Sequence, residues 1–312
     1  MQDQRPDRAR YLDHARVAEK VRKVRAHRLR RGLVGGAQVA PEHGSAVLGI
    51  LGSGRFVSKG HAIFSTMAHA TPDSITLDVK RIAAISLDLD DTLWPIWPTI
   101  ERAERVLHEW LLREAPKTAN LLITPGILRE LREATEKERS DLAHDLSAMR
   151  RESIRAALRR SGEDPALAEP AFDVFFAERQ RVELYDDALP ALKWLSERYP
   201  LVAISNGNAD VHRTGVGRWF RAAFNAREFG SGKPHAAIFR AAAASVGVQP
   251  EAVLHVGDDA ALDVVGALGA GMQAAWLVRD ERPWEHDAHP QLIVPNLHAL
   301  CVALMPGSSR AD

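Results

Sequence analysis

The chain has 312 residues, of which 46% are hydrophobic and 26% charged, and its 41 Lys and Arg balance 41 Asp and Glu. This apolar content excludes disorder throughout the chain, and the sequence lacks the roughly 18 consecutive apolar residues of a membrane-spanning helix. A lone cysteine, Cys301, excludes an intrachain disulfide and a thiolate metal cluster, so we expect the protein in the cytoplasm.

Residues 1–66 differ in composition from the rest of the chain. They carry thirteen Lys and Arg against five Asp and Glu, whereas the remaining residues carry 28 against 36. The segment offers only a thin apolar stripe, which predicts a disordered or non-native N-terminal extension, with Met67 as a possible true start. A nucleic-acid-binding segment and a transit peptide are the alternatives; we expect nucleic acid to be an unlikely partner.

The rest of the chain predicts an α/β fold with a helical insert. Residues 82–87 form a short apolar run typical of a buried strand, and residues from about 99 to 182 indicate helices throughout. Strands and helices then alternate: strands at 201–204, 253–256 and 273–278, and helices at 236–246 and 260–268. Such alternation predicts a Rossmann-like three-layer sandwich with a parallel sheet, over residues 80–94 and 186–305, interrupted by a helical cap domain over residues 95–185.

Four polar clusters lie at or near the predicted carboxyl ends of strands, where α/β folds bind ligands. They begin 117, 28 and 25 residues apart, counted from Asp88 to Ser205, Lys233 and Asp258. Their members are Asp88, Asp90, Asp91 and Thr92; Ser205, Asn206, Gly207 and Asn208; Gly232, Lys233 and Pro234; and Gly257, Asp258 and Asp259 with Asp263.

The residue types in these clusters suit phosphate and metal binding. Alternate residues leaving a strand point the same way, so Asp88 and Asp90 can share a site, where their repulsion favours a cation between them. Carboxylates after a glycine suit Mg²⁺, and a serine hydroxyl with glycine-freed N–H groups can hold an anion. Each cluster taken alone is also explained by a turn, a helix cap or a solvated side chain.

Taken in order, the four clusters resemble the haloacid dehalogenase (HAD) superfamily of phosphohydrolases. Its pattern is Asp-x-Asp-x-Thr, Ser or Thr with Asn-Gly, Lys-Pro, and Gly-Asp-x4-Asp, and it covers residues from about 82 to 300. The resemblance implies a HAD-like core with a C1-type cap.

The resemblance, like the residue types, implies a phosphatase mechanism. Asp88 would be the nucleophile and Asp90 the general acid and base. Mg²⁺ would be held by Asp88, Asp258 and the backbone carbonyl of Asp90, with Asp259 and Asp263 supporting it. The predicted phosphate-binding residues are Thr92, Ser205, Asn206 and Lys233. Because haloacid dehalogenases lack an acid at the position of Asp90, phosphate chemistry is favoured over dehalogenation; a phosphomutase or a non-catalytic binding protein are further alternatives.

Substrate choice is expected to come from the cap. The candidate specificity residues are Trp94, Trp97, His144 and Arg150, with Arg179 and Arg181 as further cap arginines. Trp94 and Trp97 either line the cleft or are buried at the cap hinge. Stretches such as residues 87–93, 200–209 and 254–259 resemble the YigB-like phosphatases, which act on FMN and on 5-amino-6-(5-phospho-D-ribitylamino)uracil. We therefore expect a small phosphorylated metabolite as partner, with a phosphoglycolate, sugar-phosphate or broad-range phosphatase as the alternative; the sequence does not indicate an oligomeric state.

Overall fold

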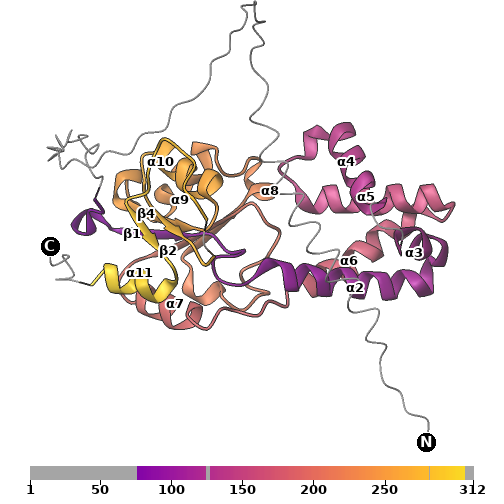
Figure 1. The fold of residues 1–312 in the computed structure, drawn as a ribbon, viewed down its shortest axis with the longest axis horizontal. Coiled ribbons are helices and arrows are strands. Elements are labelled where there is room, and N and C mark those ends of the chain that lie inside the picture. Colours follow the sequence, from indigo (N-terminus) through magenta and orange to yellow (C-terminus); the bar gives the residue numbers. More distant parts are fainter. Residues whose placement is uncertain (1–75, 124–126, 281, 306–312) are drawn as a thin grey trace, which may run out of the picture. The chain divides into compact units, whose positions relative to one another are not determined.

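The computed structural model describes residues 76–123, 127–280 and 282–305 (Figure 1). All of them belong to one unit that runs from Pro72 to Asp312. The extension predicted over residues 1–66 lies outside the described residues. Among the helices that are described, none is long and apolar enough to cross a membrane.

Six parallel strands form one sheet, in the spatial order β3-β2-β1-β4-β5-β6. The strands are β1 (Ala84–Leu87), β2 (Leu201–Ser205), β3 (Ala222–Asn225), β4 (Val253–Gly257), β5 (Gln273–Leu277) and β6 (Leu292–Val294). The α/β fold with a parallel sheet predicted from the sequence is confirmed. Strands β3 and β6, which were not predicted, are the two edges of the sheet, where short and half-exposed strands carry little apolar pattern.

Helices cover both faces of the sheet, as Figure 1 shows. They are α7 (Ala188–Ser196) and α11 (Leu297–Ala303) on one face, and α9 (Ala236–Ser245) and α10 (Gly266–Gly269) on the other. Successive residues of β1 point to opposite faces, so that Ile85 packs in the first core and Ala84 in the second. A π-helical segment, Ala260–Val265, precedes α10 where one continuous helix was predicted. Short α8 (Ala226–Phe229) follows β3.

The insert between β1 and β2 is helical throughout its described residues and has its own apolar core. Its α-helices are α2 (Ile96–Glu114), α3 (Pro116–Ile123), α4 (Ile127–Glu138), α5 (Leu146–Ser161) and α6 (Ala168–Arg179). Phe172 and Phe175 of α6 pack against Leu158 of α5 in a cluster separate from both sheet cores. Pro116 starts α3, since the first turn of a helix does not need the N–H that proline lacks. This insert is consistent with a C1 cap.

The two linkers between the insert and the sheet contact each other beside β1. The Tyr185 N–H donates to the Leu93 carbonyl at 3.0 Å. Arg279 joins the same region by donating to the Thr92 carbonyl at 2.9 Å and to the Asp187 carboxylate. The end of the cap is thereby held beside the residues that follow β1.

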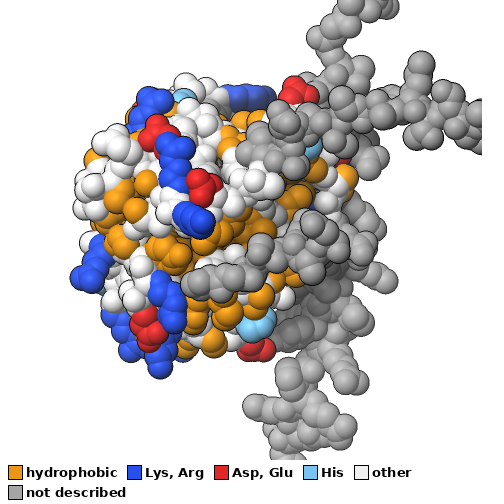
Figure 2. All heavy atoms as spheres, turned by 90° about the vertical axis from the view of Figure 1, so that its left-hand side faces the viewer, with side chains coloured by type: hydrophobic (Ala, Val, Ile, Leu, Met, Phe, Trp, Pro, Cys, Tyr) orange, Lys and Arg blue, Asp and Glu red, His pale blue; other side chains and the backbone are white. Residues whose placement is uncertain are grey.

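Apolar side chains also reach the described surface, interspersed with charged ones (Figure 2). Leu189 of α7 is 43% exposed, whereas Ile85 of β1 is fully buried between Leu201 and Leu254 of the neighbouring strands. Scattered exposed leucines are ordinary in folded proteins. Ile85 and Leu189 are therefore a suitable pair for comparing an aliphatic side chain in the core with one on the surface.

We expect Ile85→Ala to lower the free energy of unfolding by about 2–5 kcal/mol, because it leaves a cavity in the sheet core. Leu189→Ala is the matched control and should change it by no more than about 0.5 kcal/mol. Urea unfolding followed by circular dichroism measures both; equal losses would contradict the placement of β1 at the centre of the core.

Candidate active site

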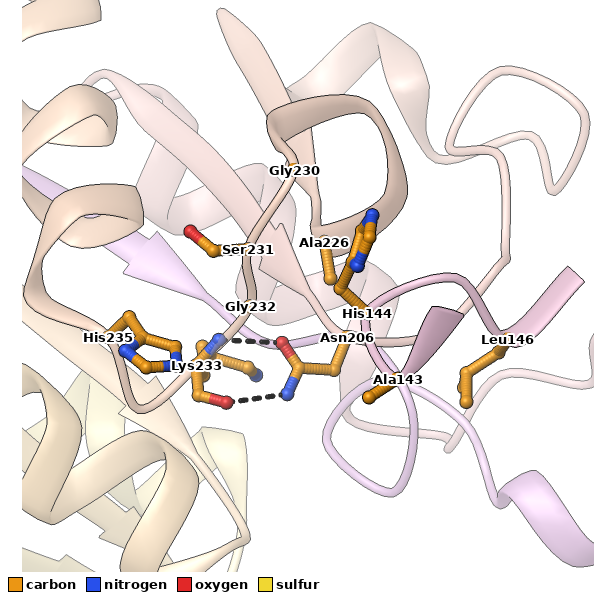
Figure 3. A pocket seen from close by; sticks show the side chains of 10 residues that line it. All are labelled: Ala143, His144, Leu146, Asn206, Ala226, Gly230, Ser231, Gly232, Lys233 and His235. Carbon is orange, nitrogen blue, oxygen red and sulfur yellow. Dashed lines mark hydrogen bonds between the residues drawn. The ribbon is translucent and has the colours of Figure 1, made fainter. Parts of the chain in front are cut away.

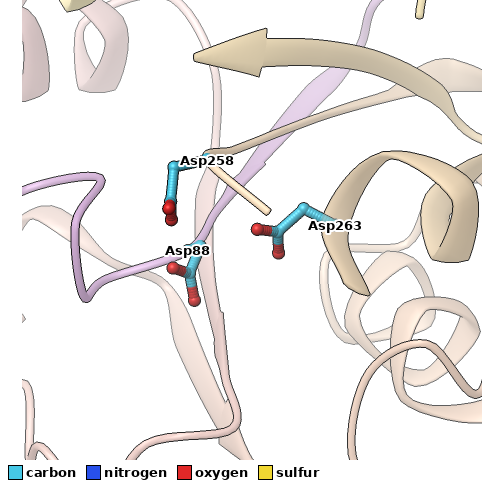
Figure 4. A group of neighbouring side chains, drawn as sticks. All are labelled: Asp88, Asp258 and Asp263. Carbon is cyan, nitrogen blue, oxygen red and sulfur yellow. The ribbon is translucent and has the colours of Figure 1, made fainter. Parts of the chain in front are cut away.

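Three carboxylates from separate parts of the chain meet at the carboxyl edge of the sheet (Figure 4). Asp88 directly follows β1, Asp258 directly follows β4, and Asp263 belongs to the π-helical segment after β4. One oxygen from each lies within 4.8 Å of the others. Because β1 and β4 are hydrogen-bonded neighbours, the sheet itself brings Asp88 and Asp258 together.

Lys233 supplies a positive charge inside this cluster. Its Nζ lies 2.5 Å from Asp88 Oδ1 and 2.5 Å from Asp263 Oδ1, and its side chain is only 3% exposed. The Asn206 side chain holds the lysine's backbone: Asn206 Nδ2 donates to the Lys233 carbonyl at 2.8 Å, and the Lys233 N–H donates to Asn206 Oδ1 at 2.7 Å (Figure 3). The second and third sequence clusters are therefore clamped together.

A buried network that sequence reasoning missed supports Asp263. His255 Nε2 lies 3.1 Å from Asp263 Oδ1, and His255 Nδ1 lies 2.8 Å from Ser86 Oγ. Burial lowers the pKa of His255, so the imidazole is neutral; Nε2–H then donates to Asp263, and Nδ1 accepts from the Ser86 hydroxyl. The sequence signal for this network was that Ser86 and His255 are each a polar residue within an otherwise apolar strand.

Gly257 permits the close approach of Asp263. A Cβ at position 257 would lie 2.2 Å from the carboxyl carbon of Asp263, a separation that no real side chain tolerates. A glycine before Asp258 is therefore needed so that Asp263 can pack against the end of β4.

The cluster carries more negative charge than its lysine balances. Burial and the negative charges of Asp263 and Asp90 raise the pKa of Asp88 to about 8, against the lowering effect of Lys233. Burial and the charges of Asp88 and Asp263 likewise raise the pKa of Asp258 to about 9. Burial would raise the pKa of Asp263 as well, but Lys233 and His255 hold it at about 2.

These carboxylates fit a divalent cation. Oxygen ligands are those that Mg²⁺ prefers, and a cation between them would relieve the repulsion between buried like charges. Asp263 already accepts from Lys233 and His255 through Oδ1 and from the Asp259 N–H through Oδ2. Asp88 and Asp258 are therefore the better direct ligands, with Asp263 also close enough to contribute.

Asp90 lies in a tight turn after Asp88. Residues 91–93 form the turn, in which Asp91 has φ +59° and its N–H donates to the Trp94 carbonyl at 2.7 Å. A left-handed conformation is tolerated by aspartate better than by most residues. The Asp90 carboxylate accepts from the Trp94 indole at 2.8 Å and from Arg179 of α6. Trp94 is thus fully buried at the hinge, the second of the two places expected for it.

Two of the predicted phosphate-binding hydroxyls lie in the same region. Ser205 ends β2, and its Oγ accepts from the Gly207 N–H at 2.9 Å. Thr92 is fully buried, and its Oγ1 has no hydrogen-bond partner among the described residues.

The remaining predicted residues occupy different places. Asp259 caps the π-helical segment, accepting from the Ala261 and Leu262 N–H groups at 2.9 Å. Arg150 lies within the cap, where it pairs with Glu104 at 3.0 Å and covers the Phe175 ring. Trp97 is half-buried in α2.

His144 lines a cavity of about 400 Å³ that also reaches two of the predicted phosphate-binding residues, Asn206 and Lys233 (Figure 3). Five of the ten described residues around the cavity are small, and the others are two histidines, a leucine, an asparagine and a lysine: Ala143, His144, Leu146, Asn206, Ala226, Gly230, Ser231, Gly232, Lys233 and His235. The cap and the sheet domain both contribute to this wall.

Comparisons with known proteins agree with this geometry. A family model described as haloacid dehalogenase-like hydrolase matches residues 82–271. The chain belongs to this family. Over 228 residues it is 33% identical to the 5-amino-6-(5-phospho-D-ribitylamino)uracil phosphatase YigB of Escherichia coli (strain K12), which covers 70% of the chain and 95% of that relative.

Two further relatives differ in their reported activities. A phosphoserine phosphatase of Thermus thermophilus is 35% identical over 156 residues, which cover 48% of the chain and 63% of that relative. The crystal structure of a 2-haloacid dehalogenase from Pseudomonas syringae pv. Tomato DC3000 has a TM-score of 0.66 and 36% identity, covering 70% of the chain and 96% of that structure. The chain is a HAD-family phosphatase with a buried aspartate triad that fits a metal ion.

The shifted carboxylates predict a pH-dependent stability in the absence of metal. From the ordinary pKa of 3.8 up to about 8–9, folded Asp88 and Asp258 retain protons that the unfolded chain releases. Stability should therefore fall as pH rises through this range, and Mg²⁺ should raise Tm more at pH 8.5 than at pH 5.5, because protons compete with the metal. Differential scanning calorimetry with EDTA or Mg²⁺ measures this.

Asp258→Asn should lose the share of the fall in stability that Asp258 contributes, leaving the share of Asp88, and it should lose the Mg²⁺-dependent rise in Tm. Asp280→Asn is the matched control, since the Asp280 side chain is 81% exposed, and it should behave as the wild type. An Mg²⁺ effect that is absent, or equal at both pH values, would contradict the metal site.

Proposed function

We propose that this protein is a Mg²⁺-dependent phosphomonoester hydrolase that acts through a phosphorylated Asp88. The observation that supports this best is the contact of Asp88 with Lys233 beside Asp258, with a second carboxylate, Asp90, held two residues farther on. This arrangement provides a nucleophile, a cationic phosphate ligand, a metal ligand and a proton carrier within one centre.

In the first half-reaction, a carboxylate oxygen of Asp88 attacks phosphorus in line with the ester oxygen. The Asp88 O–P bond forms, the P–O ester bond breaks, and Asp90 gives a proton to the leaving alkoxide. Lys233 and the Ser205 hydroxyl bind the phosphoryl oxygens and offset their charge. When bound by Asp88 and Asp258, Mg²⁺ would reduce the repulsion between the nucleophile and the phosphate dianion.

In the second half-reaction, Asp90 takes a proton from a water molecule that attacks the aspartyl-phosphate. The Asp88 O–P bond breaks, inorganic phosphate leaves, and the Asp88 carboxylate is restored. One carboxyl group thus serves as acid and then as base, so no proton is gained or lost by the enzyme over the cycle.

The likeness to a 2-haloacid dehalogenase favours a second candidate reaction, displacement of halide by Asp88. A halide leaves without a proton, so dehalogenation has no use for a second carboxyl group at this place. Asp90, held by Trp94 and Arg179, therefore supports phosphate transfer over dehalogenation.

For the substrate, we propose FMN or 5-amino-6-(5-phospho-D-ribitylamino)uracil, which would give the enzyme a role in riboflavin metabolism. The likeness to YigB over 95% of that relative supports this choice. The cavity supports it too: its small residues leave about 400 Å³ next to Asn206 and Lys233, and His144 and His235 offer flat, polar rings to a heterocycle. Phosphoglycolate, phosphoserine and sugar phosphates remain the alternatives.

Asp88→Asn should abolish turnover, reducing kcat by more than about a thousandfold, because the amide is not a nucleophile. Release of inorganic phosphate measures the loss, and circular dichroism checks that the variant folds. Substantial phosphatase activity in the folded variant would refute the covalent mechanism, whereas Asp280→Asn should retain full activity.

A substrate panel tests the proposed specificity. We expect kcat/KM for FMN or the ribitylaminouracil phosphate to exceed the values for phosphoglycolate, phosphoserine and sugar phosphates by at least about tenfold, or roughly 1.4 kcal/mol. EDTA should stop the reaction and Mg²⁺ restore it. Halide release from 2-chloropropionate without phosphate release would instead establish the dehalogenase reaction.

A further inference from the structure

Arg179, the last residue of α6, is a buried cation in contact with Asp90. Its side chain is 1% exposed, and its Nη2 lies 2.6 Å from Asp90 Oδ1 and 2.8 Å from Asp90 Oδ2. Arginine stays charged when buried, so it needs a fixed anionic partner. Among the described residues, that partner is the carboxylate to which the proposed mechanism assigns proton transfer.

The sheet domain fixes the end of α6 in this place. Gln180, which follows Arg179, is 4% exposed. Its Oε1 accepts from the Asp210 N–H at 2.7 Å, and its Nε2 donates to the Asn208 carbonyl at 3.3 Å. Residues 208–210 continue the loop that carries Ser205 and Asn206. The chain at the end of α6, next to Arg179, is therefore tied to the loop after β2 as well as to the cap.

The surroundings of Gly207 show how close Asp90, Ser205 and Arg179 lie to one another. A Cβ at position 207 would lie 2.3 Å from Asp90 Oδ2, 3.1 Å from Ser205 Oγ and 3.5 Å from Arg179 Nη2. Arg179 therefore lies in the reaction centre, in contrast to Arg150, which pairs with Glu104 inside the cap. Its second amino nitrogen, Nη1, is buried and has no hydrogen-bond partner among the described residues.

We propose that Arg179 is a positioning residue for Asp90, acting together with Trp94. Trp94 Nε1 donates to Oδ1 at 2.8 Å and Arg179 Nη2 contacts both oxygens, so two donors fix the plane of a carboxylate that would otherwise be free to rotate. The proposal rests on the proposed function, because Asp90 needs a fixed orientation only if it transfers protons. The cap thus contributes to the chemistry itself as well as to substrate choice.

Substrates with different leaving groups can distinguish two roles for Arg179: positioning Asp90, or only binding phosphate. An alkyl phosphate releases a strongly basic alkoxide and needs the proton from Asp90, whereas p-nitrophenyl phosphate releases a stable anion and needs none. Since kcat/KM reports the steps up to the first irreversible one, it compares the acid-dependent step for the two substrates.

The experiment compares Arg179→Met and Arg179→Lys with the wild type. The substrates are p-nitrophenyl phosphate and the alkyl phosphate that the wild type hydrolyses best. Arg179→Met should lower kcat/KM for the alkyl phosphate at least about tenfold more than for the aryl phosphate, within the 10²–10⁴-fold range of general acid catalysis. Arg179→Lys should recover part of the difference, because one amino nitrogen makes both contacts in the native enzyme. Equal losses for the two substrates, or a rise in KM alone, would overturn the proposal.

Two more variants keep the test decisive. Arg159→Met is the matched control, because Arg159 is an exposed arginine in the last turn of α5, and both rates should stay at the wild-type level. If Arg179→Met does not fold, Trp94→Phe removes the other donor to Asp90 and should show the same selective loss for the alkyl phosphate; an unselective loss would again overturn the proposal. A wild type that hydrolyses neither phosphate refutes the proposed function instead.

Discussion

Repulsion between buried carboxylates is the constraint on which this site depends. Asp88, Asp258 and Asp263 meet in a region where burial disfavours their charged forms, and Lys233 is the protein's own counter-charge within it. The lysine is held by Asn206, and Asp263 is oriented by His255. The arrangement holds the carboxylates close enough to bind a cation, and it keeps Asp88, the proposed nucleophile, in contact with Lys233, the proposed phosphate ligand.

The topology of the insertion explains how the cap reaches the reaction centre. The chain leaves the sheet directly after Asp90 and returns through α6, so both linkers pass the end of β1. The return linker places Arg179 against Asp90, and Gln180 ties it to the loop after β2. In the proposed mechanism, this short segment would connect substrate choice with proton transfer.

The parts of the fold that sequence patterns predict are those in which burial is complete. β1 and β4 are buried on both faces and are mostly apolar, each with one polar residue, and the helices of the insert follow one another without strand-like alternation. Residues 222–225 and 292–294 escape prediction because the edges of a sheet bury only part of each strand. The π-helical segment at Ala260–Val265 also escapes it, since six residues are too few for the spacing of apolar residues to distinguish a π-helix from an α-helix.

The sequence by itself determined the four clusters of chemistry-bearing residues and their order, because carboxylates, a lysine and glycines at strand ends have few other uses in such a combination. Only the tertiary structure decided their partners. Arg179 and Asp90 are 89 residues apart, and His255 and Ser86 are 169 apart, so no local periodicity links them. The sequence alone allows Trp94 to line the cleft or to be buried at the hinge. In the structure its ring is buried and its N–H donates to Asp90. Side-chain pairing across strands and domains depends on where the whole chain folds, and local sequence does not contain that information.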